Sequence, residues 1–314
     1  MPTSTPTGWR GRPAIERVTD PAPSPATLAA DLVRLLEIEE TGTDLYRGAR
    51  SRGGIGRVFG GQVIAQALQA AQATVAGDRV AHSLHANFMR PGSEDHPIDY
   101  RVARDFDGAS FATRRVIAIQ RDVPILHLTA SFQRAETGLH HQDAMPDVPP
   151  PDALADEAAL RAHDVVHVPE RFRASLLKPR PIEFRPVLPR RWAHPVPSAP
   201  VQHSWFRVVA PIGDDPALHR AALAYASDMA LIATAMLPHG VNWTTPGMQT
   251  ASLDHALWLH EPARADAWLL YAMDSPWSGY GRGLARGRIF SADGRLIASV
   301  AQEGLMRQRR PERT

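Results

Sequence analysis

Apolar residues recur at helical spacing in two stretches of the first third of the chain. Four leucines between residues 26 and 40 fall on one helical face, and Ser24 precedes them as a candidate N-cap. Residues 60–75 repeat the pattern with many alanines, which favours close packing against a broad surface such as a sheet. The pattern therefore predicts two helices, and the second is expected to be a central one.

Strand-like segments follow, separated by turn chemistry. They cover residues 82–89, 98–104, 111–120 and 124–133, and short runs rich in Gly, Pro and Asp separate them. The second half of the chain repeats this order. A strand is expected at 204–210, a short helix at 216–224, a longer helix at 225–237, and strands at 249–259, 267–274, 283–290 and 295–306.

The two halves can be laid over each other. Phe88-Met89-Arg90-Pro91 matches Leu259-His260-Glu261-Pro262, and the same offset of 171 residues places Arg115 on Arg286. Phe59-Gly60-Gly61-Gln62 matches Tyr225-Ala226-Ser227-Asp228 at a slightly smaller offset. The shared order of elements predicts a duplication, and two unrelated α+β domains are the alternative.

Proline content sets the domain boundaries. Residues 141–200 hold 12 of the 28 prolines and are expected to form a connector over the surface, with one short helical stretch near residues 151–163. We therefore divide the chain into a tail (1–25), a first domain (26–136), a proline-rich linker (137–200), a second domain (201–308) and an end segment (309–314).

Composition and motifs exclude several classes of function. The chain has no cysteine, which removes disulfides, thiolate nucleophiles and cysteine-ligated metals. A net charge of +2 makes no case for nucleic acid, and the longest nearly apolar run, residues 229–237, is too short for a membrane span. Neither a complete G-x-S-x-G nor a complete G-x-G-x-x-G occurs, and the 14 histidines form no ligand cluster. We expect no metal and no cofactor.

Three polar residues of the second half remain as candidates for a site. Asp228 is expected in the first turn of the longer helix, where it is either a simple cap stabilised by the helix dipole or a functional carboxylate. Gln302 is in phase with the apolar positions of the last strand, so a polar partner must meet its amide there. Ser252 lies on another strand, and its direction is undecided.

Several motifs together make the sequence similar to a known family. It resembles the acyl-CoA thioesterase II family, the TesB type, which is related to the peroxisomal acyl-CoA thioesterases. The motifs that carry the resemblance, between about Leu36 and Arg307, are Val58-Phe59-Gly60-Gly61-Gln62, His82-Ser83-Leu84-His85, Phe88-Met89-Arg90-Pro91-Gly92, Asp107-Gly108, Ser110-Phe111, Arg114-Arg115, Ala226-Ser227-Asp228, Leu237-Pro238-His239-Gly240, Ser252-Leu253-Asp254-His255, Trp268-Leu269-Leu270-Tyr271 and Gln302-Glu303-Gly304.

The resemblance implies a fold, a substrate and site residues. The fold is an α+β double hotdog, in which two tandem repeats each wrap an antiparallel sheet around a long central helix. The catalytic residues are Asp228, Ser252 and Gln302, with serine in place of the threonine of the bacterial pattern. The substrate is a fatty acyl-CoA, and a homodimer or homotetramer is expected. Substrate contacts are expected at Gly60, Gly61, Gln62, Asp254 and His255.

The expected reaction is hydrolysis of the thioester by a water molecule that Asp228 activates and that Ser252 and Gln302 orient. Two alternatives are a hotdog hydratase or dehydratase, whose D-x-N-P-x-H type of motif does not occur here, and an acyl-CoA-binding module without turnover. The end of the chain, Arg310-Pro311-Glu312-Arg313-Thr314, has no peroxisomal tripeptide, so a cytoplasmic location is expected.

Overall fold

The structure is a computed structural model that describes residues 22–51, 56–189 and 191–309. The first half builds two helices and six strands before residue 135. In chain order they are α1 (Pro25–Leu36), β1 (Ile38–Gly42), β2 (Leu45–Gly48), α2 (Gly60–Ala73), β3 (Arg79–Phe88), β4 (Ile98–Asp107), β5 (Phe111–Gln120) and β6 (Val123–Arg134). The predicted central helix and the four predicted strands of this half are confirmed.

The second half repeats this series after a connector. The connector holds η1 (Pro151–Ala153), α3 (Glu157–Asp164), η2 (Val165–His167), α4 (Glu170–Leu177) and β7 (Ile182–Pro186). The remaining elements are β8 (Val201–Val208), α5 (Pro216–Ser227), α6 (Leu231–Met236), η3 (Leu237–His239), β9 (Met248–Ser252), β10 (Asp254–Leu259), β11 (Leu269–Gly279), β12 (Arg282–Ser291) and β13 (Leu296–Gln308).

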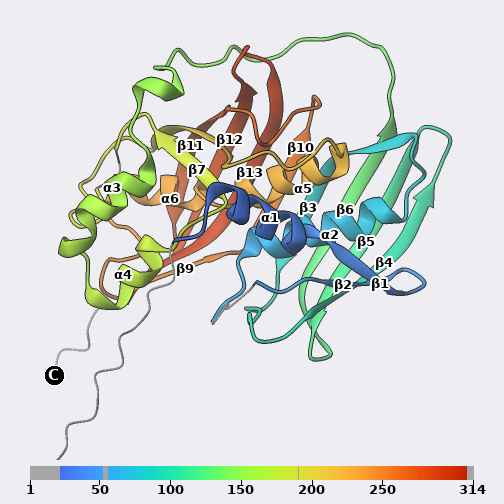
Figure 1. Ribbon diagram of the computed structural model, residues 1–314, viewed down its shortest axis with the longest axis horizontal. Coiled ribbons are helices and arrows are strands. Elements are labelled where there is room, and N and C mark those ends of the chain that lie inside the picture. The colour runs from blue at the N-terminus through green and yellow to red at the C-terminus, as the bar shows by residue number, and fades with distance from the viewer. Residues whose placement is uncertain (1–21, 52–55, 190, 310–314) are drawn as a thin grey trace, which may run out of the picture.

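One continuous antiparallel sheet joins the two halves. Its order is β1-β2-β4-β5-β6-β3-β10-β13-β12-β11-β8-β7, and β9 pairs with β13 outside this path. Each strand of the first half has a counterpart at the mirror position of the second half, and the two halves meet where β3 pairs with β10. Figure 1 shows the two sets of strands side by side, with α1, α2 and α5 crossing in front of them. The double hotdog expected from the sequence is confirmed.

Strand register confirms the offset of 171 residues. At the junction Ala256 pairs with His85, and these two residues are themselves 171 positions apart. A twofold exchange of the halves therefore maps this strand pair onto itself. The same offset relates the pair Tyr100–Ala118 of β4 and β5 to the pair Tyr271–Ile289 of β11 and β12.

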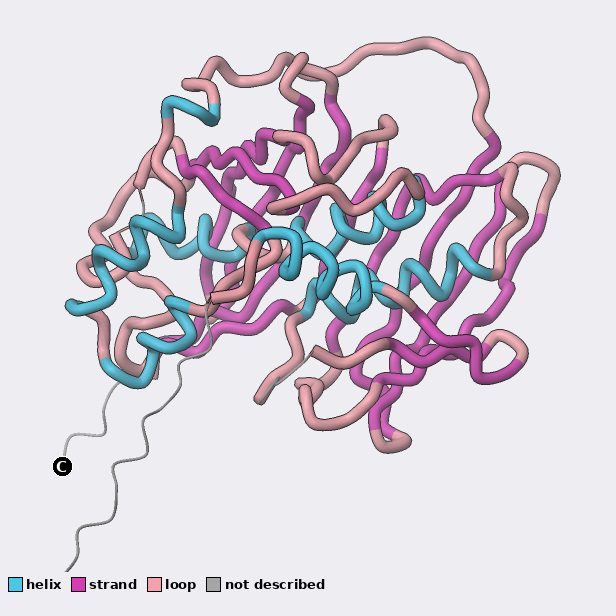
Figure 2. Tube along the Cα trace, viewed as in Figure 1, coloured by secondary structure: helices cyan, strands magenta, loops and turns pink. Residues whose placement is uncertain are grey.

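The helices form a second layer over one face of the sheet (Figure 2). One core cluster runs through both halves and includes Leu68 of α2, Leu84 of β3, Ala222 of α5 and Tyr271 of β11. Gly61 allows α2 and α5 to approach closely. Any larger residue would not fit, because a Cβ there would lie 2.5 Å from the carbonyl oxygen of Tyr225. The small side chains of α2 thus allow the packing against the sheet that their alanine content predicted, and also the close approach to α5.

The first helix is shorter than predicted. Ser24 caps α1 by accepting a hydrogen bond from the backbone N–H of Thr27, as expected. The helix ends at Leu36, and the chain then enters the β1–β2 hairpin instead of continuing to residue 40. The backbone of Glu37 is extended, so the following residues pair with β2. The spacing of apolar residues did not predict β1, because three of its residues, from Glu39 to Thr41, are polar.

The connector is more structured than a surface linker. Residues 170–177 form a second helix, and β7 pairs with β8 as the last strand of the sheet. The sheet of the second half therefore begins at Ile182 rather than at residue 201. An edge strand tolerates flanking prolines because one of its sides needs no ladder hydrogen bonds, which explains the misleading proline content. Trp192, with Val168 and Leu176, forms a small core of its own.

The helix lengths predicted around residue 225 are wrong. The longer helix is α5, of 12 residues, and α6 has only six. The backbone leaves the helical path between Asp228 and Ala230. The predicted strand 249–259 is likewise divided at Leu253, and its two parts, β9 and β10, both pair with β13. These two interruptions lie next to each other in space, because Ser252 contacts Asp228.

Candidate active site

Asp228 follows the last residue of α5 as its C-cap. The expectation that it begins a helix is therefore wrong, and the dipole of its own helix disfavours its charge. The N-terminus of a different helix, α2, stabilises the negative charge of Asp228 instead. The backbone N–H of Gly61, in the first turn of α2, donates a hydrogen bond to the Asp228 carboxylate. The repeat match of Gln62 with Asp228 as two helix starts is accordingly wrong as well.

Three side chains from three elements converge at this point. The Ser252 hydroxyl at the end of β9 donates to Oδ1 of Asp228 at 3.2 Å. Nε2 of Gln302 on β13 donates to the same oxygen at 2.5 Å and to Oγ of Ser252 at 2.9 Å. Gln302 is only 1% exposed, so the polar partner required by its position on the apolar face is present. The structure brings the three expected catalytic residues together.

Burial dominates the electrostatics of the carboxylate. Asp228 is 7% exposed, and this loss of solvent raises its pKa to about 6. The hydrogen bonds from Gln302, Ser252 and Gly61 act in the opposite direction by stabilising the charged form. The expected stabilisation of its charge by the dipole of its own helix does not occur, because Asp228 lies at the C-terminal end of α5. A carboxylate with a pKa near 6 is both ionised and basic at neutral pH.

A buried histidine lies behind the carboxylate. His255 is fully buried, and its Nδ1 lies 4.0 Å from Oδ1 of Asp228. The Ser227 hydroxyl donates to the carbonyl of Ala224 and is 2.8 Å from Nε2 of His255, so it accepts a hydrogen bond from Nε2–H. Burial lowers the pKa of His255 to about 3, which keeps the ring neutral. His255 does not line the cavity described next, and its expected contact with substrate stays a prediction.

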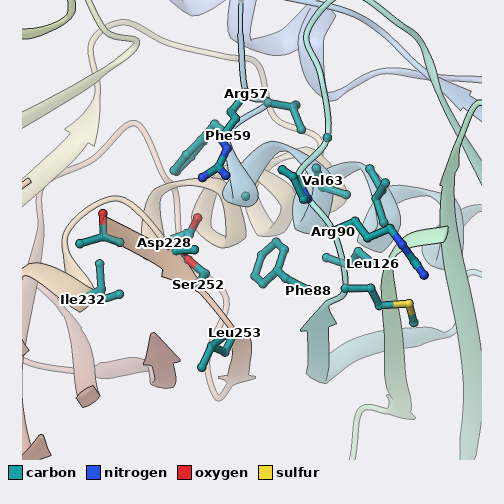
Figure 3. A pocket seen from close by; sticks show the side chains of 18 residues that line it. Arg57, Phe59, Val63, Phe88, Arg90, Leu126, Asp228, Ile232, Ser252 and Leu253 are labelled. Carbon is teal, nitrogen blue, oxygen red and sulfur yellow. The ribbon is translucent and has the colours of Figure 1, made fainter. Parts of the chain in front are cut away.

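A cavity of about 420 Å³ opens in front of Asp228 and Ser252. Phe59, Phe88 and Leu253 form part of its apolar wall, and Arg57 and Arg90 lie on its exposed side. In Figure 3, Asp228 and Ser252 lie together, and Phe88 lies between them and Arg90 as seen from this side. A carboxylate at the wall of a largely apolar cavity can act on a ligand that excludes bulk water.

Glycine at the start of α2 keeps the space beside the carboxylate free. A Cβ on Gly60 would lie 2.7 Å from Oδ2 of Asp228 and 2.9 Å from the ring of Phe88. Gly60 lines the cavity, whereas Gly61 donates to Asp228 and packs against α5. Both expected glycines therefore belong to the site, the first by leaving room and the second through its N–H group.

Two further expected residues have other surroundings. Gln62 is 4% exposed and bonds Ser51 and the carbonyl of Ala49, and it lines a second cavity. Oδ1 of Asp254 accepts the backbone N–H of Glu303 at 2.6 Å, which fastens β10 to β13. Asp254 does not line the cavity beside Asp228. This hydrogen bond gives Asp254 a bracing role, and its expected contact with substrate stays a prediction.

Sequence reasoning missed the wall of the cavity. Phe59, Phe88 and Arg90 lie in the family motifs, but the motifs do not say which side chains face a ligand. Ile232 and Thr250 carried no signal, because their direction depends on the breaks after α5 and β9. Within residues 22–51, 56–189 and 191–309, no group of three or more His, Asp or Glu side chains could hold a metal ion.

The fold and the site define a class: a double-hotdog protein with a buried Asp–Ser–Gln cluster at the wall of an apolar cavity. Comparison with known proteins specifies it. A family model described as acyl-CoA thioesterase matches residues 181–305, and one described as the acyl-CoA thioesterase N-terminal domain matches residues 49–133. The chain belongs to the acyl-CoA thioesterase family.

Individual relatives agree with this assignment over most of their length. Acyl-CoA thioesterase 2 of Haemophilus influenzae is 39% identical over 277 residues, which cover 88% of this chain and 97% of that protein. Human acyl-coenzyme A thioesterase 8 is 39% identical over 90% of this chain and 91% of its own. The crystal structure of acyl-CoA thioesterase II TesB2 from Mycobacterium marinum superposes with a TM-score of 0.73, at 40% identity over 88% of this chain and 98% of that chain.

Proposed function

We propose that this protein hydrolyses fatty acyl-CoA to a free fatty acid and CoA by attack of a water molecule that Asp228 deprotonates. The observation that carries the proposal is the convergence of Gln302 Nε2 and Ser252 Oγ on one oxygen of a buried carboxylate at a cavity wall. The Ser252 and Gln302 side chains both donate to Oδ1, and we assign the proton transfer to Oδ2, which lies next to the space beside Gly60.

The reaction needs no covalent acyl-enzyme. Water loses its proton to Asp228 as its oxygen bonds to the thioester carbonyl carbon, and the carbonyl oxygen becomes an oxyanion. Collapse of this intermediate breaks the C–S bond, and the departing CoA sulfur takes the proton that Asp228 had accepted, which restores the carboxylate. The first N–H groups of a helix have no intrahelical acceptor, so the Gly60 amide, which lines the cavity, is our candidate oxyanion donor.

The test is the release of CoA from a series of acyl-CoAs, read with a thiol reagent. The protein has no cysteine, so it contributes no signal of its own. Asp228→Asn should lower kcat by about 10²–10⁴, the range for loss of a general base. Asp266→Asn is the matched control, because it removes another carboxylate that accepts a backbone N–H, that of Ile212, but does not line the cavity, and its turnover should stay close to that of the wild type.

Two outcomes would contradict the proposal. Normal turnover by Asp228→Asn would exclude this carboxylate as the base. Tight acyl-CoA binding without turnover of any chain length by the wild type would instead favour the alternative of a binding module.

We also propose a cytoplasmic homodimer or homotetramer, on the basis of the family resemblance. By length and composition, residues Pro216–His239 could span a membrane. However, 67% of the apolar window is buried, and a core helix passes the same test. Light scattering of the purified chain would determine the oligomeric state, and fractionation of cells would determine the location.

A further inference from the structure

Hydroxyl groups satisfy the backbone at the end of α5, directly behind the catalytic carboxylate. The last four carbonyls of a helix have no intrahelical partner. The Ser227 hydroxyl donates to the carbonyl of Ala224 at 2.9 Å, and the Tyr271 hydroxyl donates to the carbonyl of Ser227 at 2.9 Å. The N–H of Asp228, which would bond Ala224 in a continuing helix, bonds the carbonyl of Ala226 instead. The single proton of the Ser227 hydroxyl is therefore used by the helix backbone.

This hydrogen bond fixes the tautomer of His255. Oγ of Ser227 lies 2.8 Å from Nε2 of His255, and because its own proton points to Ala224, it accepts the hydrogen bond from Nε2. Burial alone lowers the pKa of His255 to about 3, so the ring is neutral at pH 7 and carries its one proton on Nε2. Nδ1 then keeps its lone pair, and among the described residues no group donates a hydrogen bond to it.

The unprotonated nitrogen faces the catalytic carboxylate. Nδ1 of His255 lies 4.0 Å from Oδ1 of Asp228, and its lone pair is the negative end of the ring dipole, which disfavours the charged carboxylate. The other tautomer would present an N–H group at the same place. Asp228 already accepts hydrogen bonds from Gln302, Ser252 and Gly61, and a fourth donor would lower its pKa further. A carboxylate with a lower pKa is a weaker base toward water.

Other titratable groups near Asp228 do not take over this effect. Tyr225 of α5 and Tyr271 of β11 interact electrostatically with the carboxylate, and burial raises the pKa of both hydroxyls, which keeps them neutral. Arg57 and Arg90 lie on the exposed side of the cavity, and neither contributes to the raised pKa of Asp228. The basicity of Asp228 therefore depends on its burial, its three donors and the imidazole ring that faces it.

We propose that His255 is a positioning residue of the reaction. Ser227 holds the ring in the Nε2–H form, so that Asp228 faces an acceptor and stays a stronger base than a fourth donor would allow. This inference rests on the proposed thioesterase function and adds a residue that sets the strength of its base. His255 does not line the cavity beside Asp228, so it acts on the reaction through that carboxylate.

The test is Ser227→Ala, which removes the acceptor of the Nε2–H group. A buried N–H without a partner is unfavourable, so the neutral ring should adopt the Nδ1–H form and donate to Asp228. The acid limb of kcat/KM should move to lower pH by about one to two pH units, the effect of one hydrogen bond to a charged group. The weaker base should reduce kcat about three- to tenfold at neutral pH. An unchanged limb, or one that moves to higher pH, would overturn the proposal.

Thr74→Val is the matched control. At the end of α2, Oγ1 of Thr74 donates to the carbonyl of Ala71 and accepts from Nε of Arg114, as the Ser227 hydroxyl donates and accepts at the end of α5. Thr74 is also buried, at 6% exposed, but it does not line the cavity of the site. The variant should lose stability and keep the wild-type limb. The same response of Ser227→Ala would show that the serine is only structural.

Nitrogen-15 NMR measures the tautomer without reference to turnover. Long-range proton–nitrogen spectra distinguish the two ring nitrogens, and His255→Asn identifies the signals of this ring among the 14 histidines. The wild type should show Nε2–H at pH 7, and Ser227→Ala should show Nδ1–H. A wild-type ring with Nδ1–H would overturn the proposal even if the variant does not fold.

The carboxyl itself can be titrated if the wild type hydrolyses no acyl-CoA. That result would refute the proposed function, whereas carbon-13 NMR of the Asp228 carboxyl would still test the role of His255. The pKa of this carboxyl should be lower in Ser227→Ala than in the wild type. An equal or higher pKa in the variant would overturn the inference.

Discussion

At the scale of single residues, the central feature is a carboxylate whose pKa is raised by burial and lowered by hydrogen bonds. Burial raises the pKa of Asp228 to about 6, although Gln302, Ser252 and Gly61 all donate to it. A fully exposed aspartate would be too weak a base at neutral pH, whereas a buried one without partners would stay protonated. The three donors thus keep a buried acid ionised at neutral pH.

This arrangement should reduce the stability of the folded protein. A carboxyl whose folded pKa exceeds its unfolded value of 3.8 lowers stability as the pH rises between these two values. Asp228→Asn should therefore raise the free energy of unfolding at pH 8, by up to about 3 kcal/mol for a shift of about two units. Urea denaturation at pH 8 and pH 4 measures this, and the gain should disappear at pH 4. A variant less stable than the wild type at pH 8 would show that the hydrogen bonds outweigh the burial.

Gln302 should affect both rate and protonation. In Gln302→Ala the carboxylate loses its shortest hydrogen bond, so the pKa of Asp228 should rise further and kcat should fall. The measurement is the acid limb of the pH profile of kcat/KM, which should move to higher pH. Gln66→Ala is the control, since this equally buried amide bonds only structural groups, the Leu35 and Ala49 carbonyls and Tyr100. Gln66→Ala should lower the stability without moving the acid limb of kcat/KM. If Gln302→Ala also lowers the stability and leaves the acid limb in place, Gln302 is a structural amide.

At the scale of elements, the site depends on a break between two helices. Asp228 reaches Gly61 and Gln302 because α5 ends before it and α6 starts only at Leu231. The sequence gives no sign of this break, since no glycine or proline marks it and the apolar run continues through it. Tertiary contacts, such as the hydrogen bond from the Tyr271 hydroxyl to the carbonyl of Ser227, hold the chain there.

The start of α2 offers a direct test of this arrangement. Alanine has a higher helix propensity than glycine, yet the Cβ of Gly60→Ala would approach both the Asp228 carboxylate and the Phe88 ring. Activity should fall at least tenfold, while the melting temperature stays within a few degrees of the wild-type value. Gly77→Ala is the control, because nothing lies within 4 Å of its added Cβ. Full activity of Gly60→Ala would mean that this space is not used in the reaction.

Other elements could be predicted where local signals were strong. The pattern located β3 to β6 because each has a clear apolar face and a turn at its end, and Arg121 and Asp122 at one such turn both have positive φ. It missed β1, β2 and β7, short strands at or next to the edges of the sheet that contain charged residues or prolines. Their pairing partners, β2 and β8, stabilise them, and partners are not visible in a local pattern.

At the scale of the whole molecule, a nearly symmetric fold carries an asymmetric site. The pair Arg114–Ala130 of β5 and β6 corresponds to the pair Ala285–Gln302 of β12 and β13. The place of Gln302 is thus taken by a buried alanine in the first half. The offset of 171 residues would instead place Ser131 at this position. The two differ because the register of the last strand is shifted by one residue between the halves, and comparison of the two repeats in sequence did not reveal this shift. Among the described residues we therefore expect a single Asp–Ser–Gln cluster, the one in the second half.

The most direct test of this account is the pH profile of kcat/KM for the wild type and Asp228→Asn, from pH 5 to pH 8.5. The wild type should lose activity on the acid side with an apparent pKa of about 6, the value that burial gives Asp228. The variant should be about 10²–10⁴ times slower near neutral pH and show no such limb. Two results for the variant would contradict the account. One is an acid limb with the same apparent pKa as in the wild type. The other is half of the wild-type activity, which would indicate a second active site in the chain.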